Sequence, residues 1–194
     1  MKNSKLISPC ISFIGLVLIL FSCQSKKVIT DTKTGNNNYI GANVEVKNNE
    51  RGVIFRRFSG GVDTSKIYLP GKYNISYFDR FITYNIDSQT ENDIVSVISQ
   101  DEKKIELSIK YSFRPNLKKV ALLHHYIGEN YPESVVKSEI HSTIEEYIKQ
   151  ILAINISTNE VKQHENQILS IARKKIAEEY VDLESLQIIE FNVQ

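Results

Sequence analysis

The clearest pattern in the chain is Lys104-Ile105-Glu106-Leu107-Ser108-Ile109-Lys110-Tyr111-Ser112-Phe113, in which polar and apolar side chains alternate without interruption. Successive side chains of a β-strand point to opposite faces of its sheet, so the apolar side chains of this stretch share one face. A period of two sustained over this length predicts a half-buried strand, which ends at Arg114-Pro115.

The residues before this strand, from Tyr39 onward, favour short strands separated by turns. β-branched and aromatic residues predict strands at Val44–Val46, Gly52–Phe58, Ile67–Leu69, Phe81–Ile86 and Ile94–Ile98. The breaks include Ser59-Gly60-Gly61 and Pro70-Gly71, where proline presets φ and glycine can take a positive φ. The first half is therefore predicted to be strand-rich, with an antiparallel sheet.

After Pro115 the spacing of apolar residues changes to that of helices. Asn116 is predicted to cap a first helix that Gly128 stops, Pro132 to lie in the first turn of a second, and Ser157-x-x-Glu160 to open a third as a capping box. The apolar stripes are Leu117, Val120, Ala121, His124 and Ile127; Val136, Ile140, Ile144, Tyr147 and Ile151; and Ile168, Ala172, Ile176 and Tyr180. A last strand at Leu186–Val193 closes an α+β domain.

The N-terminus has the layout of a secretory signal peptide, residues 1–22. Lys2 and Lys5 supply positive charge, and the largely apolar run from Ile11 to Phe21 leads to Ser22 and Cys23. Leu20-Phe21-Ser22-Cys23 resembles the bacterial lipobox, which implies cleavage before Cys23 and acylation of its thiol. Two alternatives are a retained membrane anchor, for which the run is short of the roughly 20 apolar residues of a span, and a secreted protein in which Cys23 is incidental.

Counts over the rest of the chain restrict its class. The only cysteines are Cys10 and Cys23, so cleavage would leave none for a disulfide framework or a thiolate metal site. Without Lys2 and Lys5, 22 of the 24 basic residues remain against 23 acidic ones, which argues against a nucleic-acid binder. We expect residues 23–38 to hold the lipidated cysteine and a flexible polar tether, and residues 39–194 to form one domain.

No group of residues predicts catalysis or a bound cofactor or metal. Adjacent side chains of a helix point about 100° apart, so His124-His125 is a poor chelate, and His124 is expected to be a part-buried core residue. We expect Gly60-Gly61 to be a turn and one of Arg56-Arg57 to face solvent or an acid. His141 and His164 are isolated in the sequence. The pairs Glu145-Glu146 and Glu178-Glu179 are expected to lie on solvated helix faces.

Most of the domain resembles one family, the prohibitin or Band 7 (SPFH) domain. The resemblance runs from about Val44 to Val193 and rests on the order of several short motifs, none of them diagnostic alone. These motifs are Glu50–Val62, Tyr68-Leu69-Pro70-Gly71-Lys72-Tyr73, Phe78–Asp87, Ser99-Gln100-Asp101, Tyr111–Pro115, Leu122–Tyr131 and Val135–Ile140. The family often carries glycine after the aspartate of the central turn, where this chain has Glu102.

The resemblance implies a membrane-bound scaffold without catalytic activity that self-associates and organises or modulates partner membrane proteins, possible partners being envelope membrane proteins or proteases. Prohibitins continue into a coiled coil that closes a ring; the sequence given ends at Gln194, so we expect weaker assembly through contacts between Band 7 domains. Strand edges near Val53–Phe58 and helix faces within Lys137–Lys149 are the expected contact surfaces. The alternative is a monomeric lipoprotein binding module for a small ligand or peptide.

The lipobox resemblance implies a bacterial cell envelope. Gln24 is not the aspartate that commonly retains such proteins in the inner membrane, so the expected location is the outer membrane, facing the periplasm.

Overall fold

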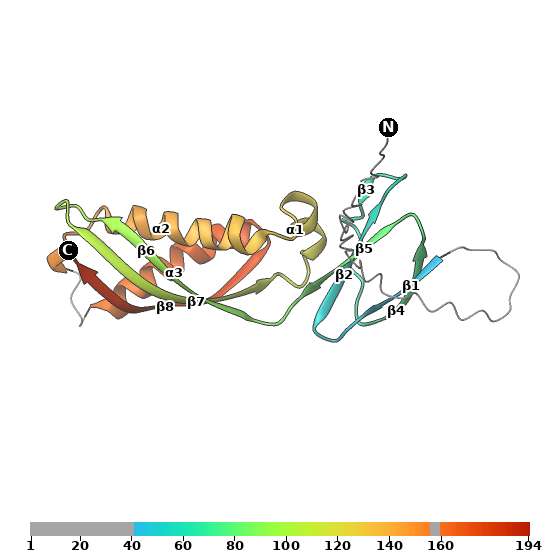
Figure 1. Ribbon diagram of the computed structural model, residues 1–194, viewed down its shortest axis with the longest axis horizontal. Helices are drawn as coiled ribbons and strands as arrows, with labels where there is room; N and C mark the ends of the chain where they lie inside the picture. The colour runs from blue at the N-terminus through green and yellow to red at the C-terminus, as the bar shows by residue number, and fades with distance from the viewer. Residues whose placement is uncertain (1–40, 156–159) are drawn as a thin grey trace, which may run out of the picture. The chain divides into compact units, whose positions relative to one another are not determined.

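The computed structural model describes residues 41–155 and 160–194 (Figure 1). The predicted signal peptide, Cys23, the tether and Ser157 of the predicted capping box lie outside these residues. The elements in chain order are β1 (Gly41–Val46), β2 (Glu50–Arg56), β3 (Gly61–Val62), β4 (Gly71–Ser76), β5 (Arg80–Asn85), β6 (Gln89–Ile98), β7 (Lys104–Pro115), α1 (Val120–Tyr126), a π-helical turn (Pro132–Lys137), α2 (Ser138–Ile148), a 3-10 turn (Ala153–Asn155), α3 (Val161–Glu178) and β8 (Val181–Val193).

The predicted α+β class is confirmed, with antiparallel strands first, then helices and a closing strand. The strands of the described residues form three antiparallel sheets, in the orders β1-β4, β3-β2-β5 and β6-β7-β8. Two cores hold them together. The smaller core joins the first two sheets through Val46, Ile54, Tyr68 and Ile75, and the larger one lies between the third sheet and the helices.

β7 is the central strand of the larger sheet, and its predicted alternation is confirmed. Ile105, Leu107, Ile109 and Phe113 are each 0% exposed on the face that packs against the helices. Figure 1 shows α2 and α3 lying along this face of the sheet. At about 25 cal/mol per Å² of buried apolar surface, this row of side chains makes a large contribution to stability.

The small sheets differ from the prediction in two places. The expected strand Ile67–Leu69 is a single bridge, in which Gly52 and Tyr68 exchange two backbone hydrogen bonds of 2.9 Å. The strand β4 begins at Gly71, directly after Pro70, and was not predicted. The expectation of an exposed strand edge near Val53–Phe58 was wrong, because β2 lies between β3 and β5 and Val53 is 0% exposed.

The first helix starts later than expected. α1 begins at Val120, after a turn that the Asn116 side chain holds: its Oδ1 accepts from the Lys118 N–H (3.1 Å) and its Nδ2 donates to Asp182 (3.0 Å). Gly128 stops this helix as predicted, with φ of 92° and its N–H donating to the Leu123 carbonyl. Pro132 opens the segment that leads into α2, with a π-helical first turn.

Glu102 occupies the turn between β6 and β7 with φ of 61°, a conformation that costs a side chain roughly 1–2 kcal/mol and glycine almost nothing. Glu102→Gly is therefore expected to raise the free energy of unfolding by about 0.5–1 kcal/mol, measured by urea denaturation. Lys103→Gly, one residue on, is the control and should lower it by about 0.5–1 kcal/mol. An equal loss in both variants would contradict the prediction.

Candidate functional site

The four histidines of the chain all make structural contacts. The Tyr84 hydroxyl lies 2.7 Å from Nδ1 of His124, and the Tyr147 hydroxyl lies 2.8 Å from Nδ1 of His164. His141 pairs with Asp93 at 2.7 Å, and the His125 ring packs edge-on against Tyr126. His124 is half-buried, as predicted.

These pairs tie elements of the fold together. Lys137 and His141 of α2 both contact Asp93 of β6, at 3.1 and 2.7 Å. Burial opposes the charge on Asp93, but the hydrogen bonds from His141 and Lys137 outweigh it and lower the pKa of Asp93. This part of the expected contact surface Lys137–Lys149 is therefore occupied in joining α2 to the sheet.

Protonation of His124 is expected to destabilise the fold. Burial lowers the pKa of His124 below its usual 6.5, so in the window just below 6.5 the unfolded chain binds the proton more readily than the folded one. The free energy of unfolding should then fall as the pH falls from about 7 to about 5, and His124→Gln should make that fall shallower. Urea titrations at several pH values measure this, with His125→Gln as control; identical slopes for wild type and His124→Gln would contradict it.

The other residues singled out from the sequence also have structural positions. Arg56 contacts Asp63 (3.2 Å) and Asp79 (3.8 Å), while Arg57 is exposed, as expected for this pair. Gly60 and Gly61 form a turn with φ of 91° and 77°.

The expected solvated glutamates are on helix surfaces. Glu145, Glu146, Glu178 and Glu179 are exposed, and Glu145 and Glu146 pair with Lys149 and Lys175 at 2.6 and 3.0 Å. Among residues 41–155 and 160–194, no three His, Cys, Asp or Glu side chains are grouped so as to hold a metal ion.

The candidate functional site lies where α3 begins beside β8. Glu165 of α3 is only 7% exposed, and its carboxylate accepts a 2.8 Å hydrogen bond from the backbone N–H of Ile188. Lys162 lies 3.6 Å from the same carboxylate. The register of β8 against β7 shifts between Ser108 and Ile109, and Ile188 lies at this bulge. Glu165 thus satisfies an edge N–H that a strand neighbour would otherwise take.

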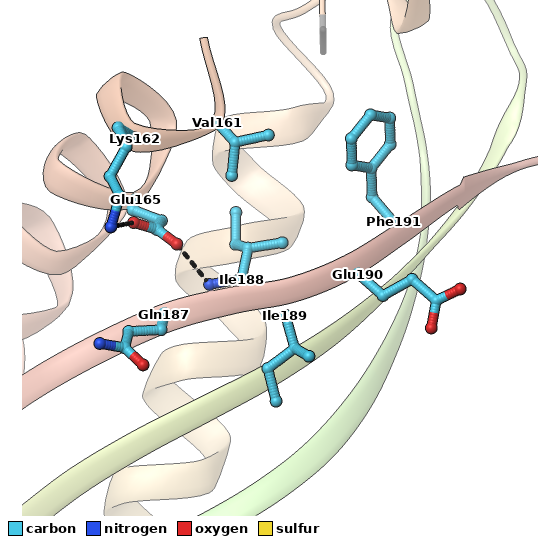
Figure 2. Close-up of a pocket in the computed structure, with 8 residues that line it drawn as sticks. All are labelled: Val161, Lys162, Glu165, Gln187, Ile188, Ile189, Glu190 and Phe191. Carbon is cyan, nitrogen blue, oxygen red and sulfur yellow. Dashed lines mark hydrogen bonds and ion pairs between the residues drawn. The ribbon is translucent and has the colours of Figure 1, made fainter. Parts of the chain in front are cut away.

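A hollow of about 640 Å³ lies between the start of α3 and the C-terminal part of β8. In Figure 2, the side chains of Val161, Ile188 and Phe191 lie on the same side of β8, whereas Ile189 points to the other side of the strand. Phe191 is half-buried, while Glu190 and Lys162 are exposed charges on the rim. The hollow is thus an apolar groove with charged margins, of a size that accepts a small ligand or several side chains.

The backbone of β8 is open beside this hollow. In the described residues β8 has a strand neighbour on one side only, β7. The N–H of Gln194 donates to the Lys104 carbonyl at 2.8 Å, and antiparallel pairing alternates, so the backbone groups of Phe191 and Val193 point away from β7. An extended segment placed here would pair with the edge and put a side chain into the hollow.

Sequence reasoning did not find this site. One signal was present: Glu165 lies three residues before Ile168, on the apolar stripe of the third helix, where a carboxylate needs a partner. Phe191 was predicted only as part of a weakly alternating strand.

Residues 44–194 match the family model described as "SPFH domain / Band 7 family". The chain belongs to this family. Among its relatives are Prohibitin-1 of Colletotrichum higginsianum, 25% identical over 74% of this chain and 52% of the relative, and mitochondrial Prohibitin-7 of Arabidopsis thaliana, 26% identical over 58% and 40%. Prohibitin-2 of Dictyostelium discoideum is 22% identical over 59% of this chain and 39% of the relative.

The Band 7 domain described here thus spans about half or less of the length of these relatives. The predicted family and its distant prohibitin relatives are confirmed, and they support a scaffold-type role. None of the helices in the described part of the chain is long and apolar enough to cross a membrane.

Proposed function

We propose that the protein is a membrane-anchored, prohibitin-like scaffold that self-associates and organises or modulates partner membrane proteins. The observation that carries the proposal is the open edge of β8 beside the apolar hollow. An edge strand of this length with an apolar docking groove next to it is a surface that folded proteins cover, and a second copy presents an identical strand for pairing.

The anchor in this proposal is a lipid on Cys23. Each buried CH₂ of an acyl chain contributes roughly 0.8 kcal/mol, so two or three chains hold a domain firmly on a bilayer. The lipobox resemblance supports the outer membrane of a bacterial envelope, with the domain in the periplasm. Partner proteins, including any protease, would then be proteins of the envelope.

The test is the native mass of the full-length protein, gently solubilised from its own membrane, beside that of Cys23→Ala. The proposal expects wild type at a multiple of the chain mass, on the order of several hundred kilodaltons if a closed assembly forms. It also expects Cys23→Ala to leave the membrane fraction. A wild-type mass near one chain would refute self-association, and full retention of Cys23→Ala would refute the lipid on Cys23 as the anchor.

One alternative has its own support. The hollow has the volume of a ligand site, so a monomeric lipoprotein binding module would take a small ligand or a peptide there. A monomeric native mass together with a bound peptide or metabolite in the purified protein would favour this function.

A further inference from the structure

Three aromatic side chains are exposed together on two neighbouring turns. Phe58 lies between β2 and β3 and is 78% exposed, and Tyr77 and Phe78 lie between β4 and β5 and are 67% and 61% exposed. The rings of Phe58 and Phe78 meet edge-on with centroids 5.6 Å apart, and those of Tyr77 and Phe78 with centroids 6.3 Å apart. We call these three residues the aromatic tip. Contiguous exposed aromatic surface of this kind marks an interaction site.

Ion pairs of Arg56 join the two turns. Arg56 contacts Asp63, on the β3 side, at 3.2 Å and Asp79, in the β4–β5 turn, at 3.8 Å. The Asp79 N–H also donates to the Ser76 carbonyl at 3.1 Å, which closes the second turn. Arg56 therefore links the two turns through the two acids, and its single positive charge offsets one of their two negative charges.

Two further exposed residues beside the tip in the sequence are positively charged. Arg57 and Arg80 are exposed, directly before Phe58 and two residues after Phe78. Aromatic side chains flanked by arginine suit the boundary between headgroups and acyl chains of a bilayer that carries anionic lipid. A water-facing surface gains nothing from this combination.

The register of the smallest sheet gives the direction of the chain at the tip. Gly41, the first residue of β1, pairs with Ser76, the residue before Tyr77. The preceding segment, which carries Cys23, therefore joins the domain at the same end as the aromatic tip. An anchor on this segment would keep this end within reach of the bilayer.

We propose that Phe58, Tyr77 and Phe78 enter the interfacial layer of an anionic lipid bilayer, with Arg57 and Arg80 at the headgroups. This second membrane contact rests on the membrane anchoring of the proposed function but not on self-association. It fixes which end of the domain faces the lipid, whereas an acyl chain on a tether leaves the orientation of the domain open.

The chain contains no tryptophan, so Phe78→Trp introduces a single fluorescent reporter at the tip. The full-length variant is reconstituted into vesicles of phosphatidylcholine and phosphatidylglycerol whose acyl chains carry bromine, a quencher within the bilayer. We expect a blue-shifted emission and strong quenching. Leu69→Trp is the matched control, because Leu69 is 57% exposed on the same part of the fold but borders the Pro70-Gly71 turn at the other end of β4; it should stay unquenched.

Charge is tested in the same reporter variant. Adding Arg57→Gln and Arg80→Gln should weaken quenching in the anionic vesicles, because each lost arginine should lower the equilibrium constant for entry of the tip into the bilayer about fivefold. The same changes should have little effect in vesicles of phosphatidylcholine alone. Lys72→Gln, an exposed cation at the far end of β4, is the control and should change nothing.

Water-like emission of Phe78→Trp with no quenching in anionic vesicles would overturn the proposal. Blue-shifted emission without quenching by the brominated acyl chains would also overturn it, because a protein surface would then cover the tip. The native mass measured on the same sample reports separately on self-association, so the failure of one proposal is distinguishable from failure of the other.

Discussion

Phe191→Lys is expected to reduce the native mass of the solubilised protein to that of a single chain. Phe191 forms a wall of the hollow, on the same side of β8 as Val161 and Ile188 (Figure 2), and its backbone groups point to the open edge. A lysine there would place an unpaired charge where a second copy must bury apolar surface. The free energy needed to bury that charge should exceed the free energy that holds an ordinary self-association interface together.

Ile94→Lys is the matched control for this change. Ile94 is 61% exposed and lies on β6, at the opposite edge of the same sheet, so its replacement should leave the native mass unchanged. Val193→Pro tests the backbone separately: it removes an outward N–H without taking a bond from β7, and should also lower the mass. If Phe191→Lys folds and assembles as wild type does, β8 is not the contact between copies.

Phe113→Ala is expected to lower the free energy of unfolding by about 3–5 kcal/mol, the largest single effect on stability that we predict. Phe113 is 0% exposed on the central strand β7. Its ring stacks on Tyr111 with centroids 6.0 Å apart and meets Tyr131 edge-on at 6.1 Å, so truncation leaves a cavity beside these two rings. Urea denaturation followed by circular dichroism gives the value.

The same substitution at Phe78 is the control. Phe78 is 61% exposed, so Phe78→Ala should change stability by no more than about 0.5 kcal/mol. A loss below about 1 kcal/mol in Phe113→Ala would mean that the surrounding side chains close the cavity, and that the core is less rigidly packed than its burial indicates.

The strands with a strong local pattern could be predicted from the sequence, and those set by distant contacts could not. The alternation around Ile109 gave β7 its correct start and its buried face. The first residues of β8 were missed, because Tyr180 enters this strand with φ of 65° directly after α3, a conformation that no glycine or asparagine signalled. Asn116 was predicted to cap the first helix, but its Oδ1 bonds the N–H of Lys118 in a turn before α1, and its Nδ2 bonds Asp182, far along the chain.

The candidate site could not be predicted from local sequence patterns for a similar reason. The hollow exists because Glu165 bonds the Ile188 N–H at a bulge in β8, and no pattern in the sequence places these two residues together. The aromatic tip likewise needs two turns from different hairpins, which the sequence shows as separate Phe58 and Tyr77-Phe78 motifs. What the sequence did indicate was the family, through the order of many short motifs.

The pairing of β7 with β8 has a consequence for the order in which the molecule acquires its structure. Ile105 pairs with Val193, so the central strand gains its second neighbour only when the most distant part of the domain is available. Long loops must close before such contacts form, which slows folding and disfavours early intermediates. A nascent chain whose residues 181–193 are still inside a ribosome or a translocon therefore lacks one side of its main sheet. Such a chain would complete its main sheet only once these residues are released.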